Sequence, residues 1–178
     1  MKLYVVRHGQ TDNNLNGIIQ GISNTPLNDY GRKQANELKE KLNDISFDLI
    51  LSSPLQRAKE TAEIINNNKT KIIIDNRLIE RNTGDFEGKK YNTYNHEKSW
   101  DYKLNTDLGA NIERVQSIFK RAGDFLEDIK RNYPDKTILV VSHAAFIRAL
   151  HYSIVGFSED ENLRKLKISN CALFQYDI

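Results

Sequence analysis

Hydrophobic residues fall in short runs that alternate with longer amphipathic segments along the chain. The runs cover residues 3–6, 47–51, 71–74, 137–141 and 172–176. Each run is rich in β-branched or aromatic residues and is bounded by polar or turn residues, which is typical of buried strands. The pattern therefore predicts a strand at each of these places.

The segments between the runs show the three- and four-residue spacing of amphipathic helices. We predict helices over residues 32–42, 54–66 and 112–131. The apolar positions of the last one form a single stripe: Ile112, Val115, Phe119, Ala122, Leu126 and Ile129. The second helix is predicted to start with Ser53 as its N-cap, Pro54 in its first position and Gln56 completing a capping box.

Strands that alternate with helices predict an α/β fold, here a single three-layer α/β/α domain over residues 1–178 with a mainly parallel central sheet. Residues 89–108 interrupt the pattern, because they are aromatic and polar without a clean period. We predict an insertion here that acts as a lid or sets substrate specificity. Its aromatic residues either line a substrate pocket or form a satellite hydrophobic cluster: Tyr91, Tyr94, Trp100 and Tyr102.

Composition narrows the classes of partner. The chain has 178 residues, of which 39% are hydrophobic and 28% charged, so it is a globular sequence. Its 26 Lys and Arg against 24 Asp and Glu are interspersed, which argues against nucleic acid or a membrane surface as partner. A single cysteine and a first apolar run that ends at Arg7 favour a cytoplasmic protein, as a monomer or a homodimer.

Ionisable residues follow four of the five apolar runs. Arg7 and His8 follow the first, Arg57 the second, Glu80 the third and His143 the fourth. The ligand crevice of an open parallel sheet lies outside the carboxyl ends of its strands, so we expect these side chains to meet. Each alone has an ordinary structural explanation, but buried cations gathered together are costly unless an anion neutralises them. The pattern points to a phosphate site.

These residues belong to a longer, ordered series of motifs that spans most of the chain. The series comprises Arg7-His8-Gly9-Gln10-Thr11 with Asn14, Gln20-Gly21, Pro26-Leu27, Gly31 with Gln34-Ala35, Ser52-Ser53-Pro54-Leu55-Gln56-Arg57-Ala58, Thr61-Ala62, Leu78-Ile79-Glu80, Gly84 with Phe86-Glu87-Gly88, Val141-Ser142-His143 and Arg148-Ala149-Leu150. It resembles the histidine phosphatase superfamily, also called phosphoglycerate mutase-like, and in particular its small phosphatase members.

The resemblance implies a phosphatase that acts on small phosphomonoesters. His8 would attack phosphorus and form a phosphohistidine, which water then hydrolyses. Arg7, Arg57 and His143 would stabilise charge on the phosphoryl oxygens, and Glu80 would be the general acid and then the general base. The arginines, and His143 if it is protonated, should lower the pKa of His8 and keep it neutral. Glu80 should be protonated mainly in the substrate complex, so we expect activity to fall at alkaline pH.

Further substrate or phosphate contacts are expected from Asn14, Gln20, Gly21 and Ala144. No metal and no cofactor is expected, since the arginines take the place that a metal often has in phosphoryl transfer. His96 and His151 have no carboxylate at ligand spacing, so we interpret both as ordinary structural residues. Cys171 is interpreted in the same way, as a packed strand residue.

Three alternatives stay open. A phosphoglycerate mutase is favoured by Arg81 next to Glu80, whereas Thr83, where mutases tend to have an aromatic residue, favours a phosphatase. A member that only binds phosphorylated ligands is a second alternative, and a metal-dependent hydrolase a third. Ile18 stands where family members often carry Arg, and Gly109-Ala110-Asn111 replaces a Gly-Glu-Ser run, so the pattern does not identify the phosphomonoester.

Overall fold

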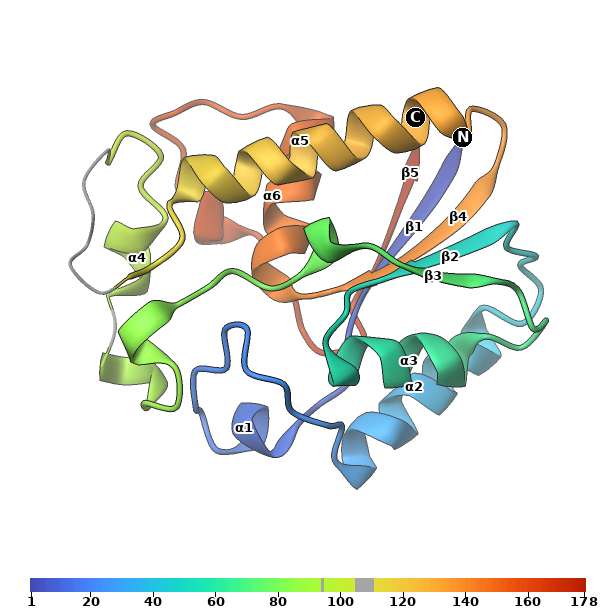
Figure 1. Cartoon of the computed structure of the whole chain (residues 1–178), viewed down its shortest axis with the longest axis horizontal. Helices are drawn as coiled ribbons and strands as arrows, with labels where there is room; N and C mark the ends of the chain where they lie inside the picture. Colours follow the sequence, from blue (N-terminus) through green and yellow to red (C-terminus); the bar gives the residue numbers. More distant parts are fainter. Residues whose placement is uncertain (94, 105–110) are drawn as a thin grey trace.

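A computed structural model describes residues 1–93, 95–104 and 111–178. All the predicted strands are present, as β1 (Lys2–Arg7), β2 (Leu49–Ser52), β3 (Ile72–Ile74), β4 (Thr137–Ser142) and β5 (Leu173–Asp177). They form one sheet in the order β3-β2-β4-β1-β5 (Figure 1). The first four are parallel and β5 runs antiparallel to β1, so the prediction of a mainly parallel sheet is confirmed.

Four longer helices accompany the sheet: α2 (Asp29–Lys41), α3 (Gln56–Ile65), α5 (Val115–Asn132) and α6 (Ala144–Val155). The described residues also form short helices, which are α1 (Asp12–Leu15), α4 (His96–Ser99), η1 (Asn76–Leu78), η2 (Gly84–Phe86), η3 (Tyr91–Thr93) and η4 (Leu163–Lys165). No helix in this part of the chain is long and apolar enough to cross a membrane.

The helices cover both faces of the sheet (Figure 1). Alternate strand residues point to opposite faces. Val5 and Val140 pack in the cluster with α5 and α6, whereas Val6 and Val141 pack in the cluster with α2 and α3. The three-layer α/β/α architecture is therefore confirmed.

Helix α6 was not among the amphipathic segments, because it is apolar on most sides. Phe146, Ile147, Leu150 and Tyr152 are all buried in the cluster between the sheet and α5. A helix enclosed in this way shows no polar stripe. Its first residue follows His143, so its position decides where that histidine lies.

The start of α3 differs from the prediction. The helix begins at Gln56, and Ser53 does not cap it. The Ser53 hydroxyl instead lies 2.7 Å from Nε2 of His143, while the Gln56 N–H donates to Oδ1 of Asn24 at 2.7 Å. A loop far away in sequence thus supplies the cap, and Ser53 is left for the site.

The described part of the insertion at residues 89–108 has two environments. Tyr102 packs edge-on against Phe119 and Phe157, as expected for a satellite cluster. Tyr91 and Trp100 line a cavity of about 580 Å³ at the carboxyl ends of the parallel strands. Tyr94 and residues 105–110, which include Ala110, lie outside the described residues.

Cys171 is not in a strand, which corrects the prediction. It lies in the turn before β5 with φ of +53°, and its backbone N–H donates to the carbonyl oxygen of Arg7 at 3.1 Å. Burial raises the pKa of its thiol to about 12. The thiolate, which is the reactive form of cysteine, is therefore not available at neutral pH.

Candidate active site

A cavity of about 580 Å³ opens at the carboxyl ends of β1, β2 and β4. Most residues that the sequence pointed to line it: Arg7, His8, Asn14, Gln20, Gly21, Arg57, Glu80 and Ala144. His143 does not line the cavity but lies buried beside it, with its ring centroid 5.1 Å from that of His8. The structure thus brings together side chains that are far apart in the sequence.

The surroundings of His8 select one form of its ring. Nδ1 lies 2.7 Å from the carbonyl oxygen of Gly9, which can only accept a hydrogen bond, and Nε2 receives one from Nε of Arg57 at 3.2 Å. The proton is therefore on Nδ1, and Nε2 carries a lone pair. Burial, then the charges of Arg7 and Arg57, hold the pKa of His8 well below its ordinary value. His8 is a neutral imidazole at neutral pH.

Arg57 is held by backbone oxygens of the loop opposite its helix. Its two terminal nitrogens donate to the carbonyl oxygens of Ser23 at 2.7 Å and of Gly21 at 2.9 Å. Burial lowers the pKa of Arg57 to about 10, so the guanidinium stays charged at neutral pH. The loop is itself fixed by Glu87, whose carboxylate accepts from the backbone N–H groups of Ile22 and Ser23.

Arg7 ends β1 and has donor groups left for a ligand. One of its terminal nitrogens donates to the carbonyl oxygen of Ile168 at 2.7 Å. Its Nε is buried and has no hydrogen-bond partner among the described residues. Burial lowers the pKa of Arg7 from its ordinary value, which is far above neutrality. An anion in the cavity would compensate this buried charge.

His143 is fully buried and oriented by Ser53. The Ser53 hydroxyl accepts from the Leu55 N–H at 3.3 Å, and among the described residues Nε2 of His143 at 2.7 Å is the acceptor within reach of its own proton. This arrangement leaves Nδ1 of His143 as the N–H donor, and that atom has no partner within the described chain. Burial and the charge of Arg57 hold its pKa well below the ordinary value. His143 is thus neutral at neutral pH, which corrects the idea that its charge helps to lower the pKa of His8.

Glu80 follows η1, and its carboxylate is held by two backbone groups. Oε1 accepts from the N–H of Arg81 at 2.8 Å and from the N–H of Ala145 at 3.1 Å. The second donor is the first turn of α6, whose positive end favours a carboxylate. The carboxylate of Glu80 thereby lies at the cavity wall and is bound to the N-terminus of α6, the helix that follows His143.

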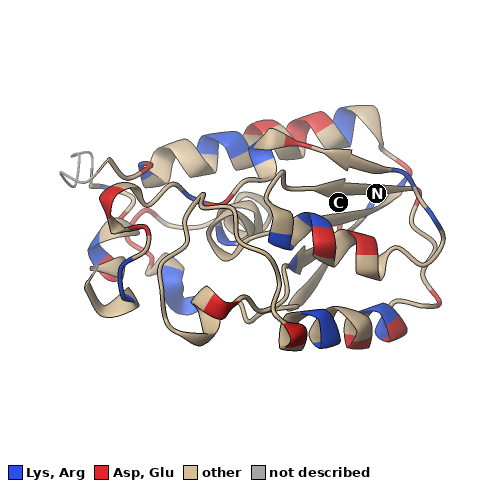
Figure 2. Ribbon diagram, turned by 60° about the horizontal axis from the view of Figure 1, so that its bottom comes forward, with Lys and Arg blue, Asp and Glu red and all other residues tan. Residues whose placement is uncertain are grey.

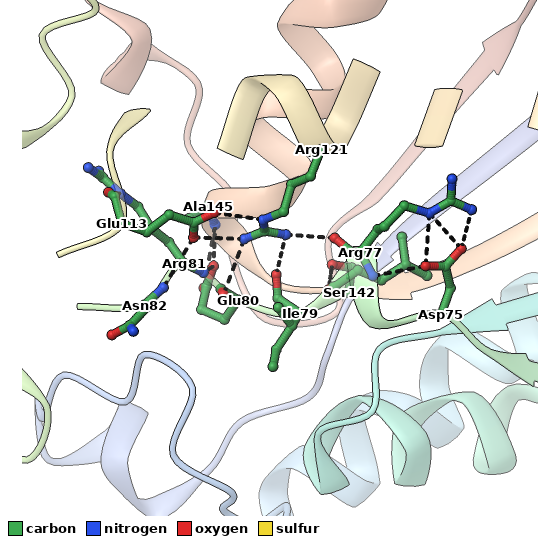
Figure 3. Close-up of polar contacts among 11 residues, drawn as sticks. Asp75, Arg77, Ile79, Glu80, Arg81, Asn82, Glu113, Arg121, Ser142 and Ala145 are labelled. Atoms are coloured by element: carbon green, nitrogen blue, oxygen red, sulfur yellow. Dashed lines mark hydrogen bonds and ion pairs between the residues drawn. The ribbon is translucent and has the colours of Figure 1, made fainter. Parts of the chain in front are cut away.

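An ion pair behind Glu80 fixes the backbone on which it sits (Figure 3). Arg121 of α5 donates to the carbonyl oxygen of Ile79 at 2.7 Å and to that of Glu80 at 3.2 Å. Glu113 binds Arg121 at 2.8 Å, and its own carbonyl oxygen accepts from Nε of Arg81 at 2.7 Å. The sequence gives no signal for this network, because it joins three separate segments.

The two amides of the site are oriented by hydroxyl and amide donors. Oδ1 of Asn14 accepts from the backbone N–H of Thr11 and from the side-chain amide of Asn170 at 3.2 Å each, which leaves its amide nitrogen for the cavity that it lines. Oε1 of Gln20 accepts from Thr11 at 2.9 Å. Asn14 can therefore act as a neutral donor to a ligand.

Several cavity residues were not predicted. They include Arg148, Arg164, Lys167 and Asn170, whereas Tyr91 and Trp100 confirm one of the two expectations for the aromatic residues of the insertion. Arg148 could have been found, since it lies four residues after Ala144 and therefore on the same face of a helix. Within the described ranges, no group of three His, Cys, Asp or Glu side chains could hold a metal ion.

The fold and the site together define an α/β enzyme of the phosphatase and phosphomutase class. Comparison with known families agrees, because the description of the histidine phosphatase superfamily (branch 1) matches residues 3–178. The chain belongs to this superfamily, and the family inferred from the motifs is confirmed.

The relatives include phosphatases and probable phosphoglycerate mutases. The chain is 38% identical to an uncharacterized phosphatase, PhoE, of Bacillus subtilis over 95% of this chain and 84% of the relative. It is 30% identical to phosphoserine phosphatase 1 of Hydrogenobacter thermophilus over 88% of this chain and 77% of that one. A solved phosphoserine phosphatase of Entamoeba histolytica, in complex with 3-phosphoglyceric acid, superposes with a TM-score of 0.83 at 29% identity, covering 98% and 89% of the two chains.

Proposed function

We propose that this protein is a phosphatase that hydrolyses small phosphomonoesters through a phosphohistidine on His8, without a metal ion. The observation that carries the proposal is the hydrogen bond from Arg57 to Nε2 of His8. It fixes the lone pair of a neutral imidazole at the wall of a cavity that is rich in cations. A neutral imidazole flanked by arginines is a nucleophile placed where an anionic phosphoryl group binds.

The reaction would proceed in two displacements. Nε2 of His8 forms a bond to phosphorus as the ester P–O bond breaks, and the leaving alkoxide takes a proton from Glu80. A water molecule then attacks the phosphohistidine and gives a proton to Glu80 as the N–P bond breaks. His8 returns to its neutral form, and the products are an alcohol and inorganic phosphate.

The remaining site residues would bind the phosphoryl oxygens. Arg7 and Arg57 supply charge, and Nδ1 of His143 and the amide of Asn14 supply neutral donors. Such preorganised donors act where charge develops in the transition state. We assign substrate contacts also to Gln20, Gly21 and Ala144, which line the same cavity.

The insertion at residues 89–108 would determine specificity. Tyr91 and Trp100 form part of the wall, so substrates must fit against them. Names of relatives support hydrolysis, since two of those described above are phosphoserine phosphatases. The mutase alternative rests on Arg81, which follows Glu80 directly and also lines the cavity.

The test is phosphate release from a panel of phosphomonoesters, with and without EDTA, by the wild type and by His8→Ala. We expect release that resists EDTA and is abolished by the substitution. A matched control is His151→Ala, because His151 is half-buried, binds the hydroxyl of Tyr176 and does not line the cavity.

Two further readouts separate the alternatives. A phosphoenzyme that is stable in alkali and labile in acid would support the phosphohistidine, and 3-phosphoglycerate isomerised without net release would instead establish a mutase. Loss of turnover in EDTA would establish a metal-dependent hydrolase. Binding of phosphate esters without any turnover would establish a binding protein.

A further inference from the structure

The charge of the cavity differs from that of the whole chain. Lys and Arg exceed Asp and Glu by only 26 to 24, and both signs are interspersed along the outer helices (Figure 2). The cavity wall, by contrast, holds six cations and one carboxylate, Glu80. A phosphoryl group carries at most two negative charges at neutral pH. Arg7 and Arg57 already match these, so the other cations exceed what the reacting group needs.

Three of these other cations come from the carboxyl-terminal part of the chain. Arg148 is on α6, Arg164 is in η4 and Lys167 follows it. None of the three has a carboxylate within ion-pairing distance among the described residues. Three arginines outside the cavity, by contrast, are paired: Arg32 with Glu60 at 2.7 Å, Arg77 with Asp75 at 2.6 Å and Arg121 with Glu113 at 2.8 Å.

Arg148 is the most constrained of the three. One terminal nitrogen donates to the carbonyl oxygen of Leu166 at 3.1 Å, and the guanidinium lies 4.8 Å from the ring centroid of Trp100. Its Nε is buried and has no hydrogen-bond partner in the part of the chain that the structure describes. Burial, with a contribution from the nearby charge of Arg164, lowers the pKa of Arg148. The guanidinium is thus positioned by a backbone oxygen and an aromatic ring, and no carboxylate among the described residues is in direct contact with it.

Arg164 is oriented toward the same region by the insertion. One of its terminal nitrogens donates to the hydroxyl of Tyr91 at 3.3 Å. Tyr91 is in turn stacked on His96, with ring centroids 3.6 Å apart and planes 16° from parallel. Together, Arg148, Arg164 and Lys167 form a cationic cluster on one cavity, separate in sequence from the residues around His8.

We propose that Arg148, Arg164 and Lys167 bind a second anionic group of the substrate, a carboxylate or a second phosphate. This inference rests on the proposed function, because it assigns the reacting phosphoryl group to His8, Arg7 and Arg57. The planar donor fork of arginine matches carboxylate and phosphate oxygens equally well. A cavity of about 580 Å³ has room for a small phosphorylated acid or a sugar bisphosphate.

Pairs of substrates that differ only in the second group test the proposal. For the carboxylate we would compare 3-phosphoglycerate with glycerol 3-phosphate, and for the phosphate, fructose 1,6-bisphosphate with fructose 6-phosphate. In at least one pair, the wild type should have a kcat/KM that is about tenfold or more higher for the substrate with the second anionic group. This is the effect of one good charged contact. No preference in either pair would overturn the proposal.

Substitutions then show whether the cluster causes the preference. Arg148→Gln, or Arg164→Gln with Lys167→Gln if the first variant does not fold, should lower the ratio of the two kcat/KM values toward one. The matched control is Lys165→Gln, which makes the same change of charge in η4 at a residue that does not line the cavity. Equal ratios in the wild type and the cluster variants would overturn the assignment.

Failure of the proposed function would look different. Hydrolysis of p-nitrophenyl phosphate that is lost in His8→Ala reports the reaction without a second anionic group. If no ester were hydrolysed, calorimetric binding of the same substrate pairs to the wild type and the cluster variants would still decide the subsite. If the wild type binds the substrate with the second anionic group more tightly and Arg164→Gln does not, the proposed subsite is supported. Equal binding of both substrates by the wild type would overturn the proposal.

Discussion

The hydroxyl oxygen of Ser53 lies 2.7 Å from Nε2 of His143, in a place that neither solvent nor the cavity reaches. The two residues come from the ends of β2 and β4, which are neighbours in the sheet. Among the described residues, Nε2 of His143 is the acceptor within reach of the Ser53 proton, so this contact favours the His143 tautomer with its proton on Nδ1. The tautomer of a proposed phosphate-binding histidine thus depends on a residue that does not line the cavity.

Ser53→Ala should therefore impair catalysis more than a simple packing change would. Removing the hydroxyl leaves Nε2 of His143 unsatisfied, at a cost of about 1–3 kcal/mol, and no longer fixes the proton on Nδ1. We expect kcat to fall by about tenfold with a smaller effect on KM, and Ser53→Thr to restore part of the loss. The control is Ser52→Ala, since Ser52 is equally buried but donates to a backbone oxygen. The same loss of kcat in both alanine variants would contradict this role.

Arg121 offers a second test, at Glu80. Arg121→Gln removes the donors that hold the backbone oxygens of Ile79 and Glu80 (Figure 3). A displaced acid matters most when the leaving group needs a proton. We expect kcat/KM to fall by about tenfold or more for an alkyl phosphate, but by much less for p-nitrophenyl phosphate, whose phenolate leaves unprotonated.

The control for Arg121 lies next to it on α5. Lys120 pairs with Asp124 on the exposed side of the helix, and such a pair contributes little to stability. Lys120→Gln should leave the rates on both esters as they are. An equal loss on the two esters in Arg121→Gln would show a general structural role in place of the positioning of Glu80.

These examples show how far the sequence leads. The strands and the strand-end residues His8, Arg57, Glu80 and His143 were predictable, because short apolar runs and period-3.6 patterns indicate the layers and a parallel sheet gathers its carboxyl ends. The role of Ser53 was not, since Ser-Pro before a helix favours a cap and only the tertiary fold brings His143 within reach.

The outer part of the cavity was also beyond prediction. Arg164 and Lys167 lie in and just after the short helix η4, where no periodicity relates neighbouring residues. Arg148 is the exception, because it lies on α6 four residues after Ala144. Residues that complete a site from loops are thus found by tertiary contacts alone.

Gly21 is expected to be sensitive to the smallest substitution. Its φ is +49°, and a Cβ there would lie 2.0 Å from Oε1 of Glu87, the oxygen that accepts from the Ile22 N–H. Gly21→Ala should cost about 1–2 kcal/mol for the backbone and a further 1–3 kcal/mol for the displaced contact. Because Gly21 also accepts from Arg57, kcat/KM should fall too.

Gly17 supplies a matched control for this prediction. It has φ of +61°, but a Cβ would meet nothing within 4 Å. Gly17→Ala should therefore show the backbone cost without the contact. Urea unfolding of the two variants measures the difference, and equal stabilities would mean that Glu87 yields at no cost.

The two buried histidines should make stability depend on pH. Burial holds the pKa of His8 and that of His143 well below the ordinary value near 6.5, so the folded protein keeps both neutral where the unfolded chain already takes up protons. The contribution of these two histidines to the free energy of unfolding is then constant above about pH 6.5 and falls as the pH drops below it, by about 1.4 kcal/mol per pH unit for each histidine. Urea unfolding between about pH 5 and pH 8 measures this slope. His8→Gln removes one of the two groups and should reduce the slope of the free energy of unfolding against pH by about 1.4 kcal/mol per pH unit. An unchanged slope would show that His8 is protonated in the folded protein.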